Sequence, residues 1–322
     1  MKGSSFSYKL YHLFIYGVLA IFFFFASFLL LSWYKAGDQV YYIKFYEGVR
    51  ELSYFEAYAY ARGVIGASDP LSIFFLWFGS FLGFSKLTYI SFWNCIFLLF
   101  IVKVIRIYKV DFFLYPFIFS NFYVLVLLTG AERLKFGVFF MVCSIVFSNW
   151  LKGFFFASAL VSHFQTISLV PSAFVYSMYN NLVRLFFSGK LSFYLLRYFV
   201  FLIFVFLSLI IIFWDALFGK FSDYFKEDFD GYNFINILAL LFCSVLVSSN
   251  WKRIACSLAP FFFLVFLFGD SRVNILAVLF VFFAFIKEKR LSHPLSIALL
   301  VYFSFKSIFL VYNIYIYGHG FV

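Results

Sequence analysis

The sequence predicts an all-α fold, that of a polytopic integral membrane protein with about ten or eleven transmembrane helices. Three observations predict it: an apolar composition, apolar stretches that recur along the chain, and charges that sort between the ends of those stretches. Of the 322 residues, 65% are hydrophobic and 12% are charged, whereas a soluble domain is about half apolar and about a quarter charged. A chain with so few charges cannot cover a water-facing surface. We therefore expect lipid surroundings and a single transmembrane domain over residues 1–322.

Apolar stretches of spanning or nearly spanning length follow one another with short connections. They lie at residues 10–33, 86–105, 111–129, 136–150, 153–169, 171–187, 193–214, 233–250, 253–268, 272–286 and 294–313. The first is too long for a signal-peptide core, which predicts a signal anchor. Several are shorter than the roughly 20 residues of a straight span, so we expect local thinning of the bilayer or irregular helix ends. Residues 71–84 are shorter still and follow Asp69-Pro70, which favours a re-entrant or interfacial helix.

The charges sort when the stretches are threaded alternately from a cytoplasmic N-terminus. One side receives most of the lysines and arginines, with only Asp111 and Glu288 as acids, and the other side receives the remaining acidic residues. This positive-inside pattern predicts that the basic side is cytoplasmic and, with eleven spans, that the C-terminus is outside. The outer side then holds two longer loops, residues 34–70 and 215–232. The same pattern explains the net charge of +11 without a nucleic-acid partner.

Motifs for nucleotide and metal chemistry are absent from the sequence. It contains no G-x-x-x-x-G-K-[ST], no G-x-S-x-G and no H-E-x-x-H, which excludes a built-in P-loop ATPase and the usual serine hydrolase and zinc protease motifs. The four cysteines form no C-x-x-C pair, and the four histidines do not cluster at ligand spacing. We therefore expect neither a metal site nor a cofactor.

The strongest local signal is a charged corner at residues 130–137, between two apolar stretches. Glu132, Arg133 and Lys135 stand at the start of the 136–150 stretch, on the predicted outer side. Two cations beside an outward helix N-terminus would form a phosphate or pyrophosphate site. The alternative is that these cations extend along the helix to the membrane surface. Because cations are less expected on the outer side, we favour the anion site.

Other polar side chains on the outer side are candidates for proton transfer or substrate contact. His163 lies near the outer end of an apolar stretch, where a histidine serves either in catalysis or in holding helices together. Asp270 and Arg272 occupy a tight outer turn, as substrate contacts or as a local ion pair. Asp38 precedes a group of tyrosines, which suits a sugar-binding surface or a general base, although a solvated loop is the simpler interpretation.

The order of these residues resembles the Wzy/EpsG-type polymerases of O-antigen or exopolysaccharide. The resemblance rests on Gly37-Asp38 with tyrosines after it, on Asp69-Pro70 before a short helix, on Arg133 with Gly137 four residues on, and on His163 near the end of the next span. It covers most of the chain in topology and residues 130–171 in motif. Leu134 stands where the EpsG-like motif usually has glutamine, so the resemblance is to the general class.

The resemblance implies a membrane-embedded glycosyltransferase at the outer face of the bacterial inner membrane. Such an enzyme transfers an oligosaccharide from undecaprenyl pyrophosphate to a lipid-linked acceptor unit, without ATP, a nucleotide sugar or another cofactor. Arg133, Lys135 and Arg272 would then neutralise the pyrophosphate. His163, Glu132, Asp270 and Asp38 are the candidates for the base that accepts the proton of the acceptor hydroxyl. The partners implied are the lipid-linked oligosaccharide, membrane lipid, a chain-length regulator and a flippase.

Three other functions remain open from the sequence. An O-antigen ligase usually has a large late outer loop, whereas residues 215–232 form a short one. A polysaccharide-lipid flippase or transporter is usually longer, with about twelve spans or with paired halves, and the sequence shows no internal symmetry. A membrane acyltransferase would require an early histidine and a paired-arginine signature, and neither is found.

Overall fold

The protein is all-helical in the part of the chain that the computed structural model describes. The description covers residues 3–189, 234–268 and 270–320, together with single residues between 193 and 211. The predicted span 193–214 therefore lies almost entirely outside the described residues, and the predicted outer loop 215–232 lies wholly outside them. The chain divides into two compact units, one of residues 1–163 and 300–322 and the other of residues 164–299.

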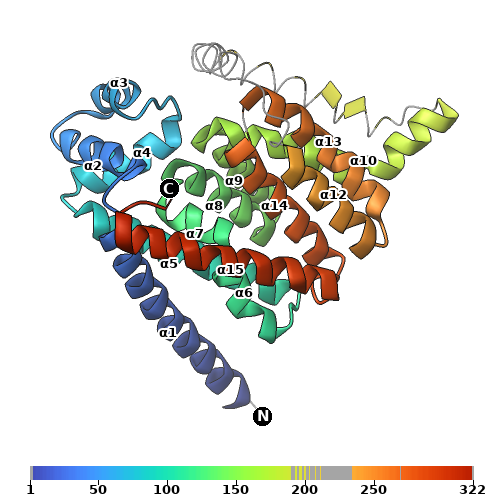
Figure 1. Cartoon of the computed structure of the whole chain (residues 1–322), viewed down its shortest axis with the longest axis horizontal. Coiled ribbons are helices and arrows are strands. Elements are labelled where there is room, and N and C mark those ends of the chain that lie inside the picture. Colours follow the sequence, from blue (N-terminus) through green and yellow to red (C-terminus); the bar gives the residue numbers. More distant parts are fainter. Residues whose placement is uncertain are drawn as a thin grey trace. The chain divides into compact units, whose positions relative to one another are not determined.

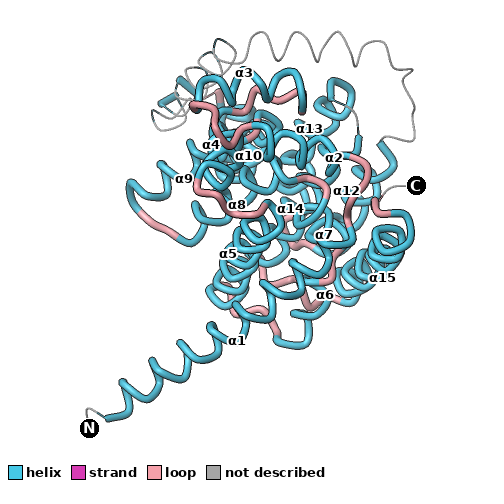
Figure 2. The backbone as a smooth tube through the Cα atoms, turned by 90° about the vertical axis from the view of Figure 1, so that its left-hand side faces the viewer, coloured by secondary structure: helices cyan, strands magenta, loops and turns pink. Residues whose placement is uncertain are grey.

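The first unit contains most of the described helices (Figure 1). They are α1 (Gly3–Trp33), α2 (Asp38–Gly48), α3 (Tyr54–Val64), α4 (Pro70–Phe81), α5 (Lys86–Ile107), η1 (Phe112–Leu114), α6 (Tyr115–Phe119), α7 (Phe122–Thr129), α8 (Glu132–Val146), α9 (Asn149–Ser162) and α15 (Pro294–Tyr317) from residue 300 on. Helix α1 packs along α5, and its N-terminal half extends away from the rest of the unit (Figures 1 and 2).

Three described helices are long and apolar enough to cross a membrane. They are Leu13–Trp33, Lys86–Ile107 and Pro294–Tyr317, and the bent pair Phe112–Phe119 and Phe122–Thr129 would make a fourth. On α1, large apolar side chains such as Phe14 and Phe22 are exposed, as expected for a helix that faces lipid. The shorter apolar helices Pro70–Phe81, Ile235–Val247 and Val273–Lys287 have 10–17 residues.

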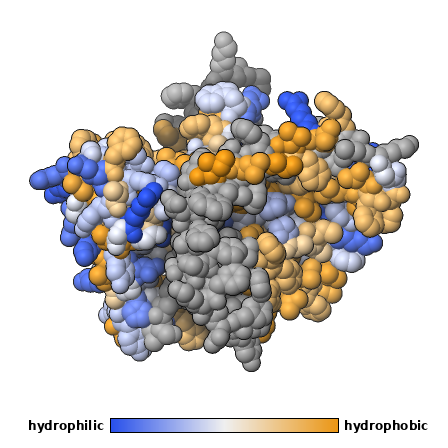
Figure 3. All heavy atoms as spheres, turned by 90° about the horizontal axis from the view of Figure 1, so that it is seen from above, coloured by the Kyte–Doolittle hydropathy of each residue, from blue (hydrophilic) through white to orange (hydrophobic). Residues whose placement is uncertain are grey.

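Residues 34–70, predicted as an outer loop between two spans, contain two short helices, α2 and α3. Helix α3 begins at a capping box, in which the Ser53 hydroxyl accepts from the Glu56 backbone N–H and the Glu56 carboxylate accepts from Ser53. These hydrogen bonds lower the pKa of the Glu56 carboxyl. Together with α4, the helices form a group of short helices (Figure 1). Hydrophilic residues predominate at the corresponding edge of Figure 3, at the left of both views.

The predicted span 111–129 is not one continuous helix. Helices α6 and α7 are separated at Ser120 and Asn121, and the two parts of the broken span meet at an angle of 47°. The Asn121 side chain accepts from the Tyr123 backbone N–H and so begins α7 as an N-cap. On the other side of the break, the Ser120 hydroxyl donates to the Pro116 carbonyl. Side-chain hydrogen bonds to the backbone thus replace the helical ones at this point.

The predicted span 153–169 is not one continuous helix either. Helix α9 ends at Ser162, and His163 has extended backbone angles, φ −157° and ψ 120°. A short 3-10 helix, η2 (Phe164–Ser168), follows and belongs to the second unit. The segment after Ser162 is polar, and buried Ser and Thr side chains compete with the helix for backbone hydrogen bonds. This break gives His163 its position at the end of the first unit.

The second unit is a bundle of helices that follow η2. They are α10 (Leu169–Ser188), α12 (Ile235–Val247), α13 (Trp251–Phe268) and α14 (Asp270–Lys287). Helix α13 packs against α10, α12 and α14, and its residues Ile254, Leu258 and Phe261 are fully buried. This spacing of three and four residues is the buried stripe of an amphipathic helix, and it makes α13 the central helix of the unit.

Candidate functional site

The first turn of α8 brings three charged side chains into the interior of the first unit. Glu132, Arg133 and Lys135 are exposed by only 0%, 6% and 1%, so the corner expected at the membrane surface is buried. Successive helical positions are about 100° apart, so these side chains leave the helix in different directions. Each therefore meets a different part of the unit.

Glu132 is the centre of a polar network with Lys86 and Gln39. Its Oε1 atom lies 2.7 Å from Lys86 Nζ and accepts a second hydrogen bond of 2.7 Å from Gln39 Nε2. Gln39 also donates to the Thr129 carbonyl, and Lys86 also donates to Gln39 Oε1. The buried carboxylate is thus matched by a cation and an amide, as buried charges require. The network joins α2, α5 and α8.

Arg133 turns toward α2 and the start of α4. Its Nη1 atom lies 3.0 Å from Asp69 Oδ2, and its Nε donates to the Tyr42 hydroxyl at 3.2 Å. Burial alone would lower the pKa of the Arg133 guanidinium, but Tyr42 and Asp69 outweigh burial and raise its pKa above the ordinary value. Arg133 is therefore a permanent cation in a nearly dry position.

His163 reaches the same carboxylate from the end of α9. Its Nδ1 atom lies 3.3 Å from Asp69 Oδ2, and its side chain is 2% exposed. One oxygen of Asp69 therefore faces both the guanidinium of Arg133 and the imidazole of His163. We call these three residues the Asp69 cluster. The structure thus brings together two residues predicted from sequence, Arg133 and His163, which are 30 positions apart.

Lys135 points to α5 instead of the Asp69 cluster. Its Nζ donates to Asn94 Oδ1 at 2.6 Å, and Asn94 donates in turn to Ser27 Oγ at 2.6 Å and to the Leu128 carbonyl at 2.8 Å. These bonds connect α8 with α5, α1 and α7. In this arrangement Lys135 holds helices together, whereas the sequence interpretation placed it on the pyrophosphate beside Arg133.

The remaining predicted site residues lie apart from these contacts or outside the described side chains. Asp38 begins α2 and is exposed, while its neighbour Gln39 is buried in the network around Glu132. Asp270 is the first residue of α14, and Arg272 lies in the same turn. The side chains of Asp270 and Arg272 lie outside the described residues, so their predicted roles stay predictions.

Sequence reasoning did not assign site roles to Asp69, Lys86 and Gln39. Asp69 had a visible signal, since it immediately precedes Pro70 and so marks a helix start. Lys86 had another, because it follows the helix cap Ser85 at the predicted outer end of an apolar span, where cations are less expected. Gln39 gave no comparable signal, because a polar side chain in a short helix is normally solvated. Tyr42 was noted only as one of the tyrosines that follow Asp38, and not as a partner of Arg133.

Comparison of the chain with protein-family models, curated proteins and solved structures finds no match. The chemistry of the site therefore carries its interpretation. Within the described ranges, no three His, Cys, Asp or Glu side chains gather in a way that could hold a metal ion. What the site does offer is one buried carboxylate in contact with both a guanidinium and an imidazole.

Proposed function

We propose that this protein is a polytopic membrane glycosyltransferase that polymerises lipid-linked oligosaccharide units. The observation that carries the proposal is the Asp69 cluster, in which one carboxylate oxygen lies 3.0 Å from Arg133 Nη1 and 3.3 Å from His163 Nδ1. A guanidinium and an imidazole at one place are the two groups that transfer of a sugar from a pyrophosphate needs. The donor would be an oligosaccharide on undecaprenyl pyrophosphate, and the acceptor a second lipid-linked unit.

The proposal includes about ten or eleven membrane spans with a cytoplasmic N-terminus in a bacterial inner membrane. The apolar helices support it, since three or four of them have the length and composition of spans. The remaining helices would cross where the bilayer is thinned or where neighbouring helices cover their ends. The predicted sorting of basic connections then places the Asp69 cluster near the outer face.

In the proposed reaction, the acceptor hydroxyl attacks the anomeric carbon of the donor sugar. The bond between that carbon and the pyrophosphate oxygen breaks, and undecaprenyl pyrophosphate leaves with the electron pair. A new bond forms between the anomeric carbon and the acceptor oxygen, and the hydroxyl proton passes to a base. Because the leaving group is already activated, the transfer balances without ATP.

Arg133 has the chemistry to stabilise the leaving pyrophosphate. A guanidinium has five N–H donors, and the bonds to Asp69 and Tyr42 use two of them. The others can meet phosphate oxygens, and a preorganised cation in a dry site stabilises developing negative charge strongly. Asp69 holds the guanidinium in place before the substrate arrives.

His163 has the chemistry to act as the base. Its Nδ1 faces the Asp69 carboxylate, so the proposal assigns proton transfer to Nε2. A carboxylate beside one imidazole nitrogen orients the ring and stabilises the imidazolium that forms when the other nitrogen takes the proton. Glu132 is less suited to this role because Lys86 and Gln39 already hold its Oε1 atom.

Substrate access requires movement of the α2–α4 segment. Tyr42 on α2 and Asp69 at the start of α4 contact Arg133 directly, and Arg133 and His163 are 6% and 1% exposed. A pyrophosphate can reach the free N–H donors of the guanidinium only when the helices that bury it move aside. In the proposed enzyme, the short outer helices therefore act as a cover that admits the donor and excludes water.

Deletion of the protein from its host tests the reaction class. We expect the ladder of surface glycolipid on a gel to collapse to core plus a single unit, because units are still made and attached but no longer joined. Loss of every unit would instead favour a ligase or a flippase. An unchanged ladder would contradict the proposal.

Point variants test the Asp69 cluster. We expect Arg133→Ala and His163→Ala each to abolish the ladder while the amount of membrane protein stays unchanged, and Arg133→Lys to restore at most part of it, because lysine lacks the planar fork. Arg50→Ala is the matched control, since Arg50 is an exposed arginine after α2, and we expect a normal ladder. Normal ladders in both cluster variants would remove the site.

A further inference from the structure

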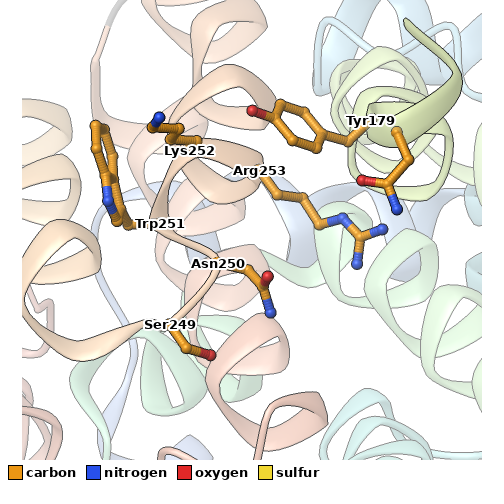
Figure 4. A pocket seen from close by; sticks show the side chains of 7 residues that line it. Tyr179, Ser249, Asn250, Trp251, Lys252 and Arg253 are labelled. Carbon is orange, nitrogen blue, oxygen red and sulfur yellow. The ribbon is translucent and has the colours of Figure 1, made fainter. Parts of the chain in front are cut away.

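The second unit contains a polar pocket that the proposed reaction does not use. It has a volume of about 250 Å³ and lies between α10 and the turn that joins α12 to α13. Its lining residues are Tyr179, Asn180, Ser249, Asn250, Trp251, Lys252 and Arg253. Figure 4 shows Tyr179 extending from α10 toward the first turn of α13, which carries Lys252 and Arg253. We call this the α10–α13 pocket.

Two adjacent cations line the pocket and lie against aromatic rings. Lys252 Nζ lies 5.7 Å from the centre of the Trp251 ring, and the Arg253 guanidinium carbon lies 5.2 Å from the centre of the Tyr176 ring. Lys287, at the end of α14, lies 4.9 Å from the same tyrosine ring. The start of α13 and the end of α14 thus bring three cations to one end of the unit, and Tyr176 of α10 lies against two of them.

Neither Lys252 nor Arg253 forms an ion pair with a carboxylate in the described part of the chain. There, no Asp or Glu oxygen lies within the 4.0 Å ion-pair distance of Lys252 or Arg253. Glu288, which follows Lys287 at the end of α14, accepts a hydrogen bond from the Ser248 hydroxyl. A polar, open pocket with two such cations attracts an anion from outside.

We propose that the α10–α13 pocket binds the phosphate group of an anionic phospholipid. Arg253 and Lys252 supply the charge, and Asn180, Ser249 and Asn250 supply hydrogen bonds to the phosphate oxygens. A lipid is the source because the surroundings are apolar: Trp251 is 40% exposed, and α12 exposes Leu238 and Phe242 by 51% and 65%. An exposed tryptophan beside lysine and arginine is typical of the headgroup level of a membrane.

The pocket is a second site and stands apart from the proposed reaction. Lys252 and Arg253 belong to the basic connections that the sequence places on the cytoplasmic side, whereas Arg133 and His163 belong to the outer side. A phospholipid bound here would anchor the ends of α10 and α13 to the cytoplasmic leaflet.

Native mass spectrometry of the purified full-length protein in detergent tests this site. The probes are dioctanoyl phosphatidylglycerol, dioctanoyl phosphatidylcholine and inorganic phosphate. We expect the wild-type protein to bind phosphatidylglycerol at least about tenfold more tightly than phosphatidylcholine. The Lys252→Gln/Arg253→Gln variant should lose about tenfold in affinity for phosphatidylglycerol, because charge-assisted bonds to phosphate are lost.

The control is the Lys289→Gln/Arg290→Gln variant, which removes the same charge from two exposed residues after α14 that do not line the pocket. We expect it to keep wild-type affinity within about threefold. Equal losses of affinity in both variants would mean that the lipid responds to the net charge of the protein and not to the pocket, and would overturn the site. Unchanged binding in the pocket variant, or displacement of the lipid by equimolar inorganic phosphate, would overturn it as well. Circular dichroism of each variant confirms that it folds.

Discussion

The two groups of cations in this chain lie in opposite environments. In the first unit, Arg133 and Lys86 are largely buried, and each meets a carboxylate at 3.0 Å or less. In the second unit, Lys252 is exposed, Arg253 is partly exposed, and both lie against aromatic rings. A buried cation needs a counter-charge beside it, because burial removes its hydration. An exposed cation stays hydrated and can bind an anion from outside. The difference separates charges that build the fold from charges that remain available at a surface.

The largest expected effect follows from removing a counter-charge in the first unit. Glu132→Gln leaves Lys86 charged, largely buried and without its carboxylate, so we expect the free energy of unfolding to fall by about 3–5 kcal/mol. Thermal unfolding in detergent, followed by tryptophan fluorescence, measures the change. Glu47→Gln on α2 is the control, because Glu47 is exposed, and should stay within about 0.5 kcal/mol of the wild type. A Glu132→Gln protein as stable as the wild type would show that Lys86 does not need this carboxylate.

A double-mutant cycle on Asp69 and Arg133 measures how strongly these two buried charges stabilise each other. The Asp69→Asn/Arg133→Gln double variant should destabilise the protein by less than the sum of the two single variants, because each single variant leaves a buried charge unmatched and the double variant leaves none. We expect a coupling free energy of about 2 kcal/mol between the two positions. Unfolding midpoints of the four proteins give this value. Strict additivity would mean that the 3.0 Å contact contributes nothing.

A smaller loss of stability is expected where α4 packs against Tyr89 and Tyr46. A Cβ at Gly79 of α4 would lie 2.5 Å from the Tyr89 ring and 2.6 Å from the Tyr46 hydroxyl, so we expect Gly79→Ala to destabilise by about 1–3 kcal/mol. Gly63→Ala is the matched control, since nothing lies within 4 Å of its Cβ, and should be neutral or slightly stabilising. Melting curves that rank the two variants in the opposite order would contradict this packing.

The smallest effect on stability is expected in the second unit. Lys252→Gln/Arg253→Gln removes two cations that are not fully buried, so we expect the free energy of unfolding to change by less than about 1 kcal/mol. The same melting assay applies, with the Lys289→Gln/Arg290→Gln variant as the control. A loss as large as that of Glu132→Gln would mean that these cations also hold the fold together.

Much of the helical layout could be predicted from hydrophobic pattern alone. The helices α5, α10 and α15, at residues 86–107, 169–188 and 294–317, follow predicted apolar stretches at 86–105, 171–187 and 294–313. Helices α2 and α3 were missed because they are polar and short, although Ser53 and Glu56 carry the capping-box spacing. The break at His163 was missed because an apolar run does not report where polar side chains compete with the helix.

The candidate site was predictable only in part. Arg133 and His163 stood out because a charge or an imidazole beside an apolar span is costly and therefore conspicuous. Their common partner Asp69 was seen as a helix start and not as a site residue. Its contact with both depends on how α4, α8 and the end of α9 pack, and no sequence spacing encodes that packing.

The sequence is sufficient to predict that this chain is helical and rich in helices suited to lipid, because composition and apolar run length are local properties of the chain. Which polar groups contact one another depends on how the helices pack. Asp69, Arg133 and His163 come from three elements, and Lys86, Gln39 and Glu132 from three. Each group is stable when buried only because the others satisfy it, and that mutual requirement is a property of the packed helices.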